Sequence, residues 1–496
     1  MKSNRSKGIT LSYLYFVLNT IISIFMSAFV IRSVGQTNYG VYQSMTAFIS
    51  YLVLLEFGTG TIMTRNISLC KKDGSDDLKI KKNVSTIWSL TIVLSLLILL
   101  VSLVFWFSLD TVYSNSMTSE QIALGKELFV FAVGNLLFSF LRQTLNGLLI
   151  GFECYSLDKS ISIIKLLSRT VILVILLSVN NSIFIVVIVD FLLSLAAFLI
   201  TLIYCVIKLH AKLVFRYFDR GVFKLITPLA FAMLLQTIVN TANGNVDKFL
   251  ISIMMTPEDV SVYSVAMSMF MMFSSVASLP VTMFMPAIAK NMQNNLKGKE
   301  LTKTLVQPCR LNVLITGVIA FGFLCVGQQF INIIYGEDYT NSWLCAIIVI
   351  LPTFVNMTNA VIINVIDILR KRPIYSCILL ITTVLNIALT VISIIYIGMV
   401  GAAAATGLTL IIQTIILNIY YKKKIGISVF YLYLKSYKGI LPCLLFASVI
   451  SILIIYLLDN ILLQFFIGGI VFVISFFVPY YLFGMNDYEK NILKKY

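Results

Sequence analysis

The sequence predicts an all-α polytopic membrane protein. Hydrophobic residues make up 59% of the 496 residues and charged residues only 12%, and the mean hydropathy is +0.96. The apolar residues form fourteen segments, each long enough to cross a bilayer core, which takes about 20 helical residues. The longest gap between segments is about 23 residues, which leaves no room for a soluble domain of ordinary size.

The fourteen expected transmembrane helices follow one another along the whole chain. They are 9–33, 39–63, 84–108, 123–150, 160–180, 183–207, 226–253, 260–287, 311–334, 343–366, 374–397, 402–421, 439–458 and 461–483. The first follows a basic start, MKSNRSKG, that resembles a signal peptide. Its apolar run is too long for one and lacks an Ala-x-Ala site, so we expect a retained first span.

The distribution of charge predicts the orientation. Lys and Arg collect in every second gap, and 31 of the 37 basic residues fall on one side. By the positive-inside rule this side is cytoplasmic, so both the N- and the C-terminus are expected there. The opposite gaps carry acids: Asp110, Glu120, Glu258, Asp259, Glu337, Asp338 and Asp459. This asymmetry accounts for the net charge of +16, so no nucleic-acid partner is expected.

Several kinds of chemistry are excluded by residue content. The eight cysteines are scattered without a CxxC pair, and His210 is the single histidine, which argues against metal clusters and histidine catalysis. Neither GxxxxGK[ST] nor GxGxxG occurs, so ATP hydrolysis is not expected. We expect a protein that is not an enzyme and uses no cofactor or metal. An ion gradient, the membrane potential or the substrate gradient would drive it.

A weak internal repeat has an offset of about 221 residues. Asn19 in the first span falls on Asn240 in the seventh, and Asn135 in the fourth falls on Asn356 in the tenth. Because six spans separate the copies, they share one orientation and are expected to be related by a pseudo-twofold axis along the membrane normal. A cleft between two such six-helix lobes suits alternating access. The expected units are an N-lobe with spans 1–6 (1–222), a C-lobe with spans 7–12 (223–425), and spans 13 and 14 with a cytoplasmic tail (426–496).

Polar residues follow one face of several spans. In the fourth span, Asn135, Ser139, Arg142 and Asn146 have the spacing 0, 4, 7, 11, which confines them to one side of a helix. The seventh span has the same spacing. The candidate substrate-binding amides are Asn19, Asn135, Asn146, Gln236, Asn240 and Asn243. Interhelical hydrogen bonds, worth about 0.6 kcal/mol on average, are an equal explanation for such uncharged residues.

Charged residues within spans are harder to attribute to packing, because each costs about 2.5 to 3.5 kcal/mol at mid-membrane on the insertion scale. Lys165 and Arg169 share one face of the fifth span, and Arg142 lies in the fourth. We expect these cations to converge in the N-lobe as a substrate site, because a cationic pocket lined by amides suits phosphate and sugar groups. Snorkelling of Lys165 to the surface is one alternative, and a salt-bridge network with Glu56 and Asp190 is another.

A second set of charged residues suits coupling or gating. Its members are Glu56, Asp190, Asp247 and Lys248. Asp247 and Lys248 are adjacent near the outer end of the seventh span, where a structural ion pair or an outer gate is as good an explanation as a ligand site.

Parts of the chain resemble a known family. The run FVIRSVGQTNYGVY at 29–42, followed by EFG at 56–58, resembles the opening of polysaccharide flippases of the multidrug/oligosaccharidyl-lipid/polysaccharide exporter superfamily. NVDKF at 245–249 and GMVGAAAATG at 398–407 are similar to later family patterns. The resemblance implies a flippase without covalent chemistry, with basic residues in a central cavity. Arg142, Lys165 and Arg169 are the candidates by position, although the second lobe has few basic residues.

The resemblance also implies a substrate and a place in the cell. The substrate would be an undecaprenyl-diphosphate-linked oligosaccharide repeat unit, moved from the inner to the outer leaflet of the bacterial cytoplasmic membrane for capsule, exopolysaccharide or O-antigen synthesis. Membrane lipids and a polysaccharide polymerase are the implied partners.

Three other functions remain open at this point. A multidrug cation antiporter of the same fold would favour acidic sites without neighbouring cations. A flippase for lipid II or a teichoic-acid precursor differs only in its substrate. A membrane glycosyltransferase or polymerase would usually have a large extracytoplasmic loop or a paired acidic motif at a membrane edge, and the sequence shows neither.

Overall fold

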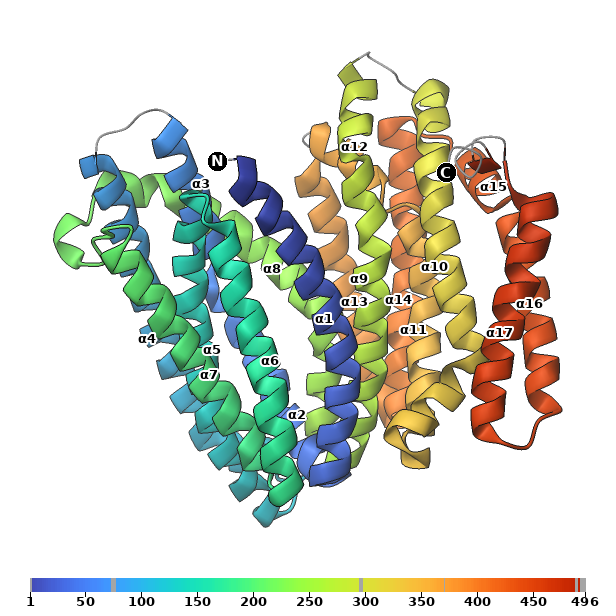
Figure 1. Ribbon diagram of the computed structural model, residues 1–496, viewed down its shortest axis with the longest axis horizontal. Coiled ribbons are helices and arrows are strands. Elements are labelled where there is room, and N and C mark those ends of the chain that lie inside the picture. Colours follow the sequence, from blue (N-terminus) through green and yellow to red (C-terminus); the bar gives the residue numbers. More distant parts are fainter. Residues whose placement is uncertain (1, 73–76, 294–297, 370, 487–488, 491–496) are drawn as a thin grey trace. The chain divides into compact units, whose positions relative to one another are not determined.

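The computed structural model describes residues 2–72, 77–293, 298–369, 371–486 and 489–490, apart from some side chains within α1, α8 and α9 (Figure 1). Every regular element in these ranges is a helix, which confirms the all-α class. The elements up to residue 293 are α1 (Lys2–Val34), α2 (Gln36–Leu52), η1 (Val53–Glu56), α3 (Thr59–Lys72), α4 (Asp77–Val112), α5 (Ser119–Gly151), α6 (Tyr155–Val179), α7 (Ile183–Ile207), η2 (Phe215–Tyr217), α8 (Arg220–Met254) and α9 (Pro257–Gln293). The later ones are α10 (Gly298–Tyr335), η3 (Glu337–Tyr339), α11 (Thr340–Thr358), α12 (Ile362–Ile368), α13 (Arg372–Ile397), α14 (Met399–Tyr420), η4 (Tyr421–Ile425), α15 (Val429–Tyr437), α16 (Ile440–Tyr456), α17 (Ile461–Pro479) and η5 (Tyr480–Gly484).

The chain is a multi-pass membrane protein. Among the described residues, twelve helices are long and apolar enough to cross a membrane. The number rises to thirteen if α15 and α16, which are bent by 48° relative to each other, are counted together as one span. The remaining expected segment, 226–253, lies within α8, several of whose side chains fall outside the described residues. A count of fourteen and the cytoplasmic placement of both termini therefore stay predictions.

Contacts divide the chain into two compact units, Met1–Ser261 and Val262–Tyr496. By its contacts α8 belongs to the first unit, where it packs on α2 and α4. The expected lobes, with a boundary at 222/223, rest on the sequence repeat, which a division by contacts does not test. The lobes and their pseudo-twofold axis stay predictions.

Two expected spans are interrupted. The second was expected to be one helix over 39–63, but α2 ends at Leu52 and α3 begins at Thr59. Between them lie η1 and two residues with left-handed backbone, Phe57 (φ 51°) and Gly58 (φ 64°). A left-handed residue ends a helix, and for Phe this conformation is strained. The tenth span is likewise broken between α11 and α12. An apolar sequence pattern carries no signal for either break.

Small residues bring helices of the first unit close together. A Cβ added at Gly147 of α5 would lie 2.1 Å from the carbonyl oxygen of Gly60 in α3. Beside this contact, the hydroxyl of Thr144 lies 2.8 Å from that of Thr59 and 3.2 Å from that of Thr91. Such approach of small residues is typical of helix pairs in membranes.

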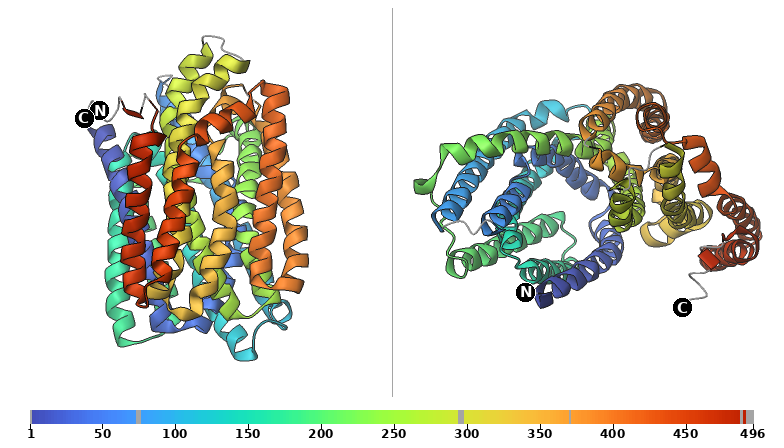
Figure 2. Two further views of the ribbon diagram at one scale, coloured as in Figure 1. Left: turned by 90° about the vertical axis from the view of Figure 1, so that its right-hand side faces the viewer. Right: turned by 90° about the horizontal axis from the view of Figure 1, so that it is seen from above.

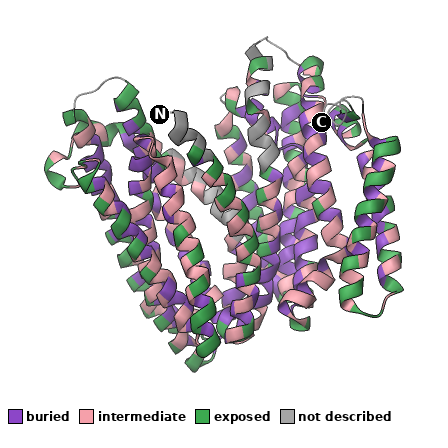
Figure 3. Cartoon of the chain, viewed as in Figure 1, coloured by how far each residue is buried: buried purple, intermediate pink, exposed green. Residues whose placement is uncertain are grey.

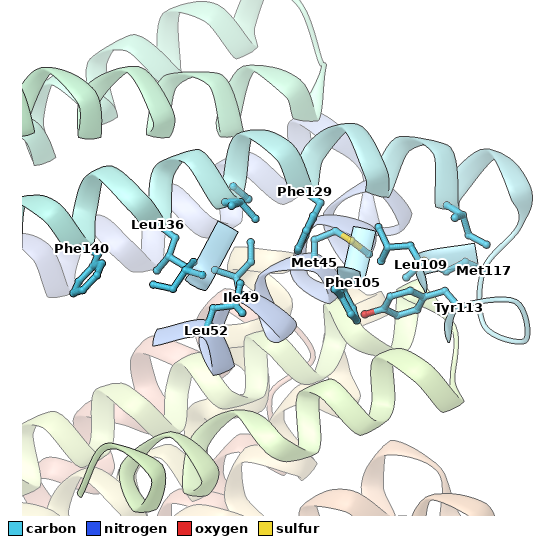
Figure 4. Packing of buried hydrophobic residues seen from close by; sticks show 14 of the residues in the cluster. Met45, Ile49, Leu52, Phe105, Leu109, Tyr113, Met117, Phe129, Leu136 and Phe140 are labelled. Carbon is cyan, nitrogen blue, oxygen red and sulfur yellow. The ribbon is translucent and has the colours of Figure 1, made fainter. Parts of the chain in front are cut away.

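A cluster of apolar side chains packs between α2, α4 and α5 of the first unit. Figure 4 shows a cluster in which Met45 and Ile49 of α2 meet Phe105 of α4 and Phe129 of α5. The Phe48 and Phe105 rings are stacked, with Phe129 tilted 5.5 Å from Phe105. In both units the buried residues lie between helices, while the outward faces are largely exposed, as expected of surfaces that meet lipid (Figure 3).

The family-like run at 29–42 has a packing role. Gly40 lies in α2 directly against the start of α9, and a Cβ at this position would lie 1.9 Å from the carbonyl oxygen of Pro257. The Thr37 hydroxyl donates a hydrogen bond to the carboxylate of Glu258 one residue further on. Only glycine permits so close an approach of two backbones.

Close approaches of helices at glycine also occur in the second unit. A Cβ at Gly401 of α14 would lie 2.2 Å from the carbonyl oxygen of Ser393 in α13, which accounts for the glycine in the run at 398–407. α13 packs on α14, and α16 on α17, as neighbouring pairs (Figure 2).

Arg310 of α10 is buried and forms a two-bond ion pair with Glu489, at 2.6 and 3.1 Å. This pair fixes the chain after η5 to α10.

Candidate functional site

A polar cavity of about 470 Å³ lies inside the first unit. Five helices supply its walls. They are α1, α2, α5, α6 and α7, which are labelled in Figure 1. Its lining residues are Tyr15, Asn19, Ile22, Ser23, Met26, Ser27, Val30, Tyr39, Tyr42, Gln43, Asn135, Ser139, Arg142, Ser162, Lys165, Leu166, Arg169, Val186 and Asp190. The volume is within the range of small-molecule sites.

Helical periodicity brings the charged residues to this cavity. On α6, Ser162, Lys165 and Arg169 follow the spacing 0, 3, 7, which places them on one face. On α5, Asn135, Ser139 and Arg142 have the spacing 0, 4, 7 and also share one face, which lines the cavity. The structure therefore brings together the three cations whose convergence the sequence predicted.

Arg169 is neutralised within the cavity. Its guanidinium donates two hydrogen bonds to the Asp190 carboxylate of α7, at 2.5 and 3.0 Å. The side chains are 29% and 15% exposed, so the pair is largely shielded from solvent. A bidentate contact of this kind fixes both groups. One part of the expected salt-bridge network is therefore present.

Arg142 is only partly satisfied. One of its terminal nitrogens lies 3.3 Å from a carboxylate oxygen of Asp158 and 3.2 Å from the Ser162 hydroxyl. Its Nε is buried and has no hydrogen-bond partner among the described residues. Asp158 also lies 3.3 Å from Lys159, which divides the charge of this carboxylate between two cations. Arg142 thus keeps donor capacity beside the cavity.

Lys165 has no carboxylate partner among the residues that the structure describes. Its ammonium donates to the Ser194 hydroxyl at 2.6 Å, and this hydroxyl donates in turn to the Asn135 side-chain oxygen. Ser139 reaches the same hydroxyl at 3.4 Å. Lys165 is held inward by this polar chain and does not snorkel to the surface. In the described structure its direct contacts are with dipoles, which leaves room for an anion in the cavity.

The remaining candidates have different surroundings. Asn19 lines the cavity, whereas Asn146 does not, and its side-chain oxygen is buried without a partner in the described structure. Glu56 is buried at the α2–α3 break and belongs to neither ion pair of the cavity. Lys248 donates to Gln43 at 2.5 Å, while Asp247 is buried. The side chains of Gln236, Asn240 and Asn243 lie outside the described residues.

The sequence prediction missed several participants. Asp158 and Ser162 continue the Lys165–Arg169 face of α6, so helical spacing contains a signal for them. Ser194 lies four residues beyond Asp190 on α7, and its importance appears only from its contacts. The three tyrosines of the cavity wall, Tyr15, Tyr39 and Tyr42, look like ordinary span residues in the sequence. Groups of three or more His, Cys, Asp or Glu able to hold a metal do not occur in the described residues.

Comparison with known families decides the relationship. The family model described as polysaccharide biosynthesis protein matches residues 6–292, which is more than half of the chain. The chain belongs to this family. No curated protein sequence matches it. The matched region of this polysaccharide biosynthesis protein includes the entire cavity wall, and the match confirms the resemblance seen at 29–42 and 56–58.

Solved structures show the fold of this polysaccharide biosynthesis family member. The lipid II flippase MurJ in an inward closed conformation is similar with a TM-score of 0.72 and 18% identity, over 96% of this chain and 99% of that one. An inward-facing multidrug resistance MATE transporter of the MOP superfamily has a TM-score of 0.59 and 12% identity, over 83% and 94%. The Vibrio cholerae MATE transporter VcmN in its bent form has a TM-score of 0.50 and 11% identity, over 88% and 100%.

Proposed function

We propose that this protein is a flippase for a lipid-linked oligosaccharide carrying a diphosphate or an acidic sugar. The observation that supports this most strongly is the ammonium of Lys165. It faces the cavity without a carboxylate partner in the described structure, beside the partly satisfied guanidinium of Arg142. Phosphate and carboxylate oxygens are the groups that such donors bind best.

The cavity offers each part of such a headgroup a matching surface. Lys165 and Arg142 would hold the anionic group, and the pair of Arg169 and Asp190 would add directed hydrogen bonds beside it. Amides from Asn19 and Asn135 would meet sugar hydroxyls, and tyrosine rings supply flat, partly apolar walls. The lipid tail would stay in the bilayer while two lobes rock around the headgroup, which gives alternating access.

The charge of the cavity argues against a multidrug cation antiporter. Three cations and one carboxylate line it. Asp190, the acidic member, is already bound to Arg169. A hydrophobic cation would meet an excess of like charge, which disfavours binding.

The finer assignment is part of the proposal. We favour an undecaprenyl-diphosphate-linked repeat unit, moved from the inner to the outer leaflet of a bacterial cytoplasmic membrane for capsule, exopolysaccharide or O-antigen synthesis, with a polysaccharide polymerase acting after it. The second candidate is a lipid II or teichoic-acid precursor, because the MurJ structure, a lipid II flippase by its description, has the same fold. Both candidates share the lipid diphosphate.

Gene deletion tests the proposal and separates these candidates. A repeat-unit flippase predicts that the mutant accumulates lipid-linked repeat units and loses surface polysaccharide. Lipid II accumulation with growth arrest would indicate the second candidate instead. A mutant with normal polysaccharide, wall and teichoic acid would contradict the proposal. Complementation with Lys165→Gln should fail, while Lys126→Gln, at the far end of α5 and paired with Asp110, should restore export.

A further inference from the structure

The short helix α15 presents one exposed face that mixes large apolar and basic side chains. Phe430 is 78% exposed, Leu434 55% and Tyr431 37%. Lys435 and Lys438 are also exposed. They lie on the same face, because Lys435 follows Tyr431 by four residues and Lys438 follows Leu434 by four. The Lys435 ammonium lies 5.9 Å from the centre of the Tyr431 ring.

The opposite face of α15 is fastened to the second unit. Leu432 and Ser436 are buried there. The Tyr437 hydroxyl lies 2.6 Å from that of Thr358, and the Tyr433 hydroxyl accepts a hydrogen bond of 2.8 Å from Asn359. The buried guanidinium of Arg310 donates to the main-chain carbonyl groups of Lys435 and Lys438, at both ends of the last turn. These contacts prevent α15 from rolling, so its exposed face stays outward.

The chain on both sides of α15 defines what this face can meet. Lys422, Lys423 and Lys424 precede it and are exposed, and no acidic residue occurs between 421 and 438. Lys371, the residue before α13, donates a hydrogen bond from its ammonium to the main-chain oxygen of Lys424 at 2.8 Å. After α15 the chain bends by 48° into α16, through Gly439 in the left-handed conformation (φ 79°). α15 therefore lies at an angle to α16, and basic residues adjoin it in the sequence.

We propose that α15 is an interfacial helix that binds anionic phospholipid headgroups. Phe430, Tyr431 and Leu434 enter the boundary between headgroups and acyl chains, and the lysines of 422–438 contact the phosphates. A fixed amphipathic face with lysines beside aromatic and aliphatic groups has the composition of membrane-surface helices. Under the predicted orientation this is the inner leaflet. The site is separate from the cavity of the first unit and does not depend on the proposed substrate.

Thermal unfolding of the purified full-length protein in mixed micelles tests this proposal. Phosphatidylglycerol and phosphatidylcholine are titrated separately, and native mass spectrometry counts the lipids retained. Phosphatidylglycerol should raise the unfolding temperature more than phosphatidylcholine does, because a ligand of the folded state stabilises it. In Lys435→Gln/Lys438→Gln the affinity for phosphatidylglycerol should fall about tenfold or more, since each lysine near an anionic surface contributes roughly a fivefold change.

Two further variants keep the test decisive. Lys299→Gln/Lys303→Gln removes two exposed lysines from α10 of the same unit and should retain the preference for phosphatidylglycerol. Phe430→Ala should weaken retention of both lipids. All three variants change exposed residues only, so gel filtration is sufficient to check that they fold. Equal responses of the wild type to both lipids, or equal losses in the α10 and α15 lysine pairs, would overturn the proposal.

Discussion

Single side chains of the cavity differ in how their charge is balanced. Arg169 has a bidentate carboxylate and Arg142 shares one with Lys159, whereas the direct partner of Lys165 in the described structure is the Ser194 hydroxyl. The sequence predicted that these cations would meet, because helical spacing fixes which face each one occupies. It did not predict which cation keeps a free charge, because Asp158 and Ser194 become partners only through tertiary packing.

The ion pair of Arg169 and Asp190 yields a stability prediction. Asp190→Asn removes the partner of a largely shielded guanidinium, so the free energy of unfolding should fall by about 1–3 kcal/mol. The double variant Asp190→Asn/Arg169→Gln should recover part of the loss, since no unpaired charge remains. Denaturation in detergent measures both. Unchanged stability of Asp190→Asn would show that the pair contributes nothing to folding.

Ser194 yields a transport prediction. Ser194→Ala removes the hydroxyl that links Lys165 to Asn135, so the ammonium loses its orientation but keeps its charge. Substrate affinity should fall by about threefold to tenfold, in keeping with the net contribution of a typical hydrogen bond, and less than in Lys165→Gln. Ser194→Thr retains a hydroxyl and should recover most of the affinity. A loss in Ser194→Ala larger than in Lys165→Gln would contradict this role.

At the scale of helices, apolar runs predicted where spans occur but not how they are interrupted. The break at Phe57 and Gly58 depends on backbone conformation, and the bend before α16 depends on Gly439. The short helix α15 was expected to be part of a cytoplasmic loop over 422–438. The lysines of this segment make it polar on average, although one face of the helix is apolar. Close approaches at Gly40 and Gly147 also arise from tertiary packing.

Gly40 tests the importance of these close approaches. Gly40→Ala places a Cβ where only 1.9 Å is available to the Pro257 carbonyl oxygen, so α2 and the start of α9 must separate. Overpacking of this kind costs about 1–3 kcal/mol. Gly469→Ala in α17, where no atom lies within 4 Å of the added Cβ, is the matched control. The melting temperature should fall in the first variant only, and an equal response of both would refute the explanation.

At the scale of the whole molecule, charge distribution predicts a topology that contacts do not test. Reporter fusions or cysteine labelling after each span should place the gaps at 64–83, 208–225, 288–310 and 422–438 inside the cell, and those with Glu120, Glu258 and Asp459 outside. The positive-inside rule is the physical basis. An even number of crossings between residues 207 and 260 would remove the predicted relation between the lobes, because the two copies would then have opposite orientations.

Headgroup translocation in proteoliposomes tests the central claim most directly. The purified protein is reconstituted with a diphosphate-linked polyprenyl oligosaccharide, and a membrane-impermeant sugar-modifying enzyme reports how fast the headgroup changes leaflet. We predict rapid exchange with the wild type and with Lys126→Gln. Lys165→Gln should be slower by about tenfold or more, because a hydrogen bond to a charged group is worth about 1.5–3 kcal/mol. Absence of exchange with the wild type, or full exchange with Lys165→Gln, would contradict the account.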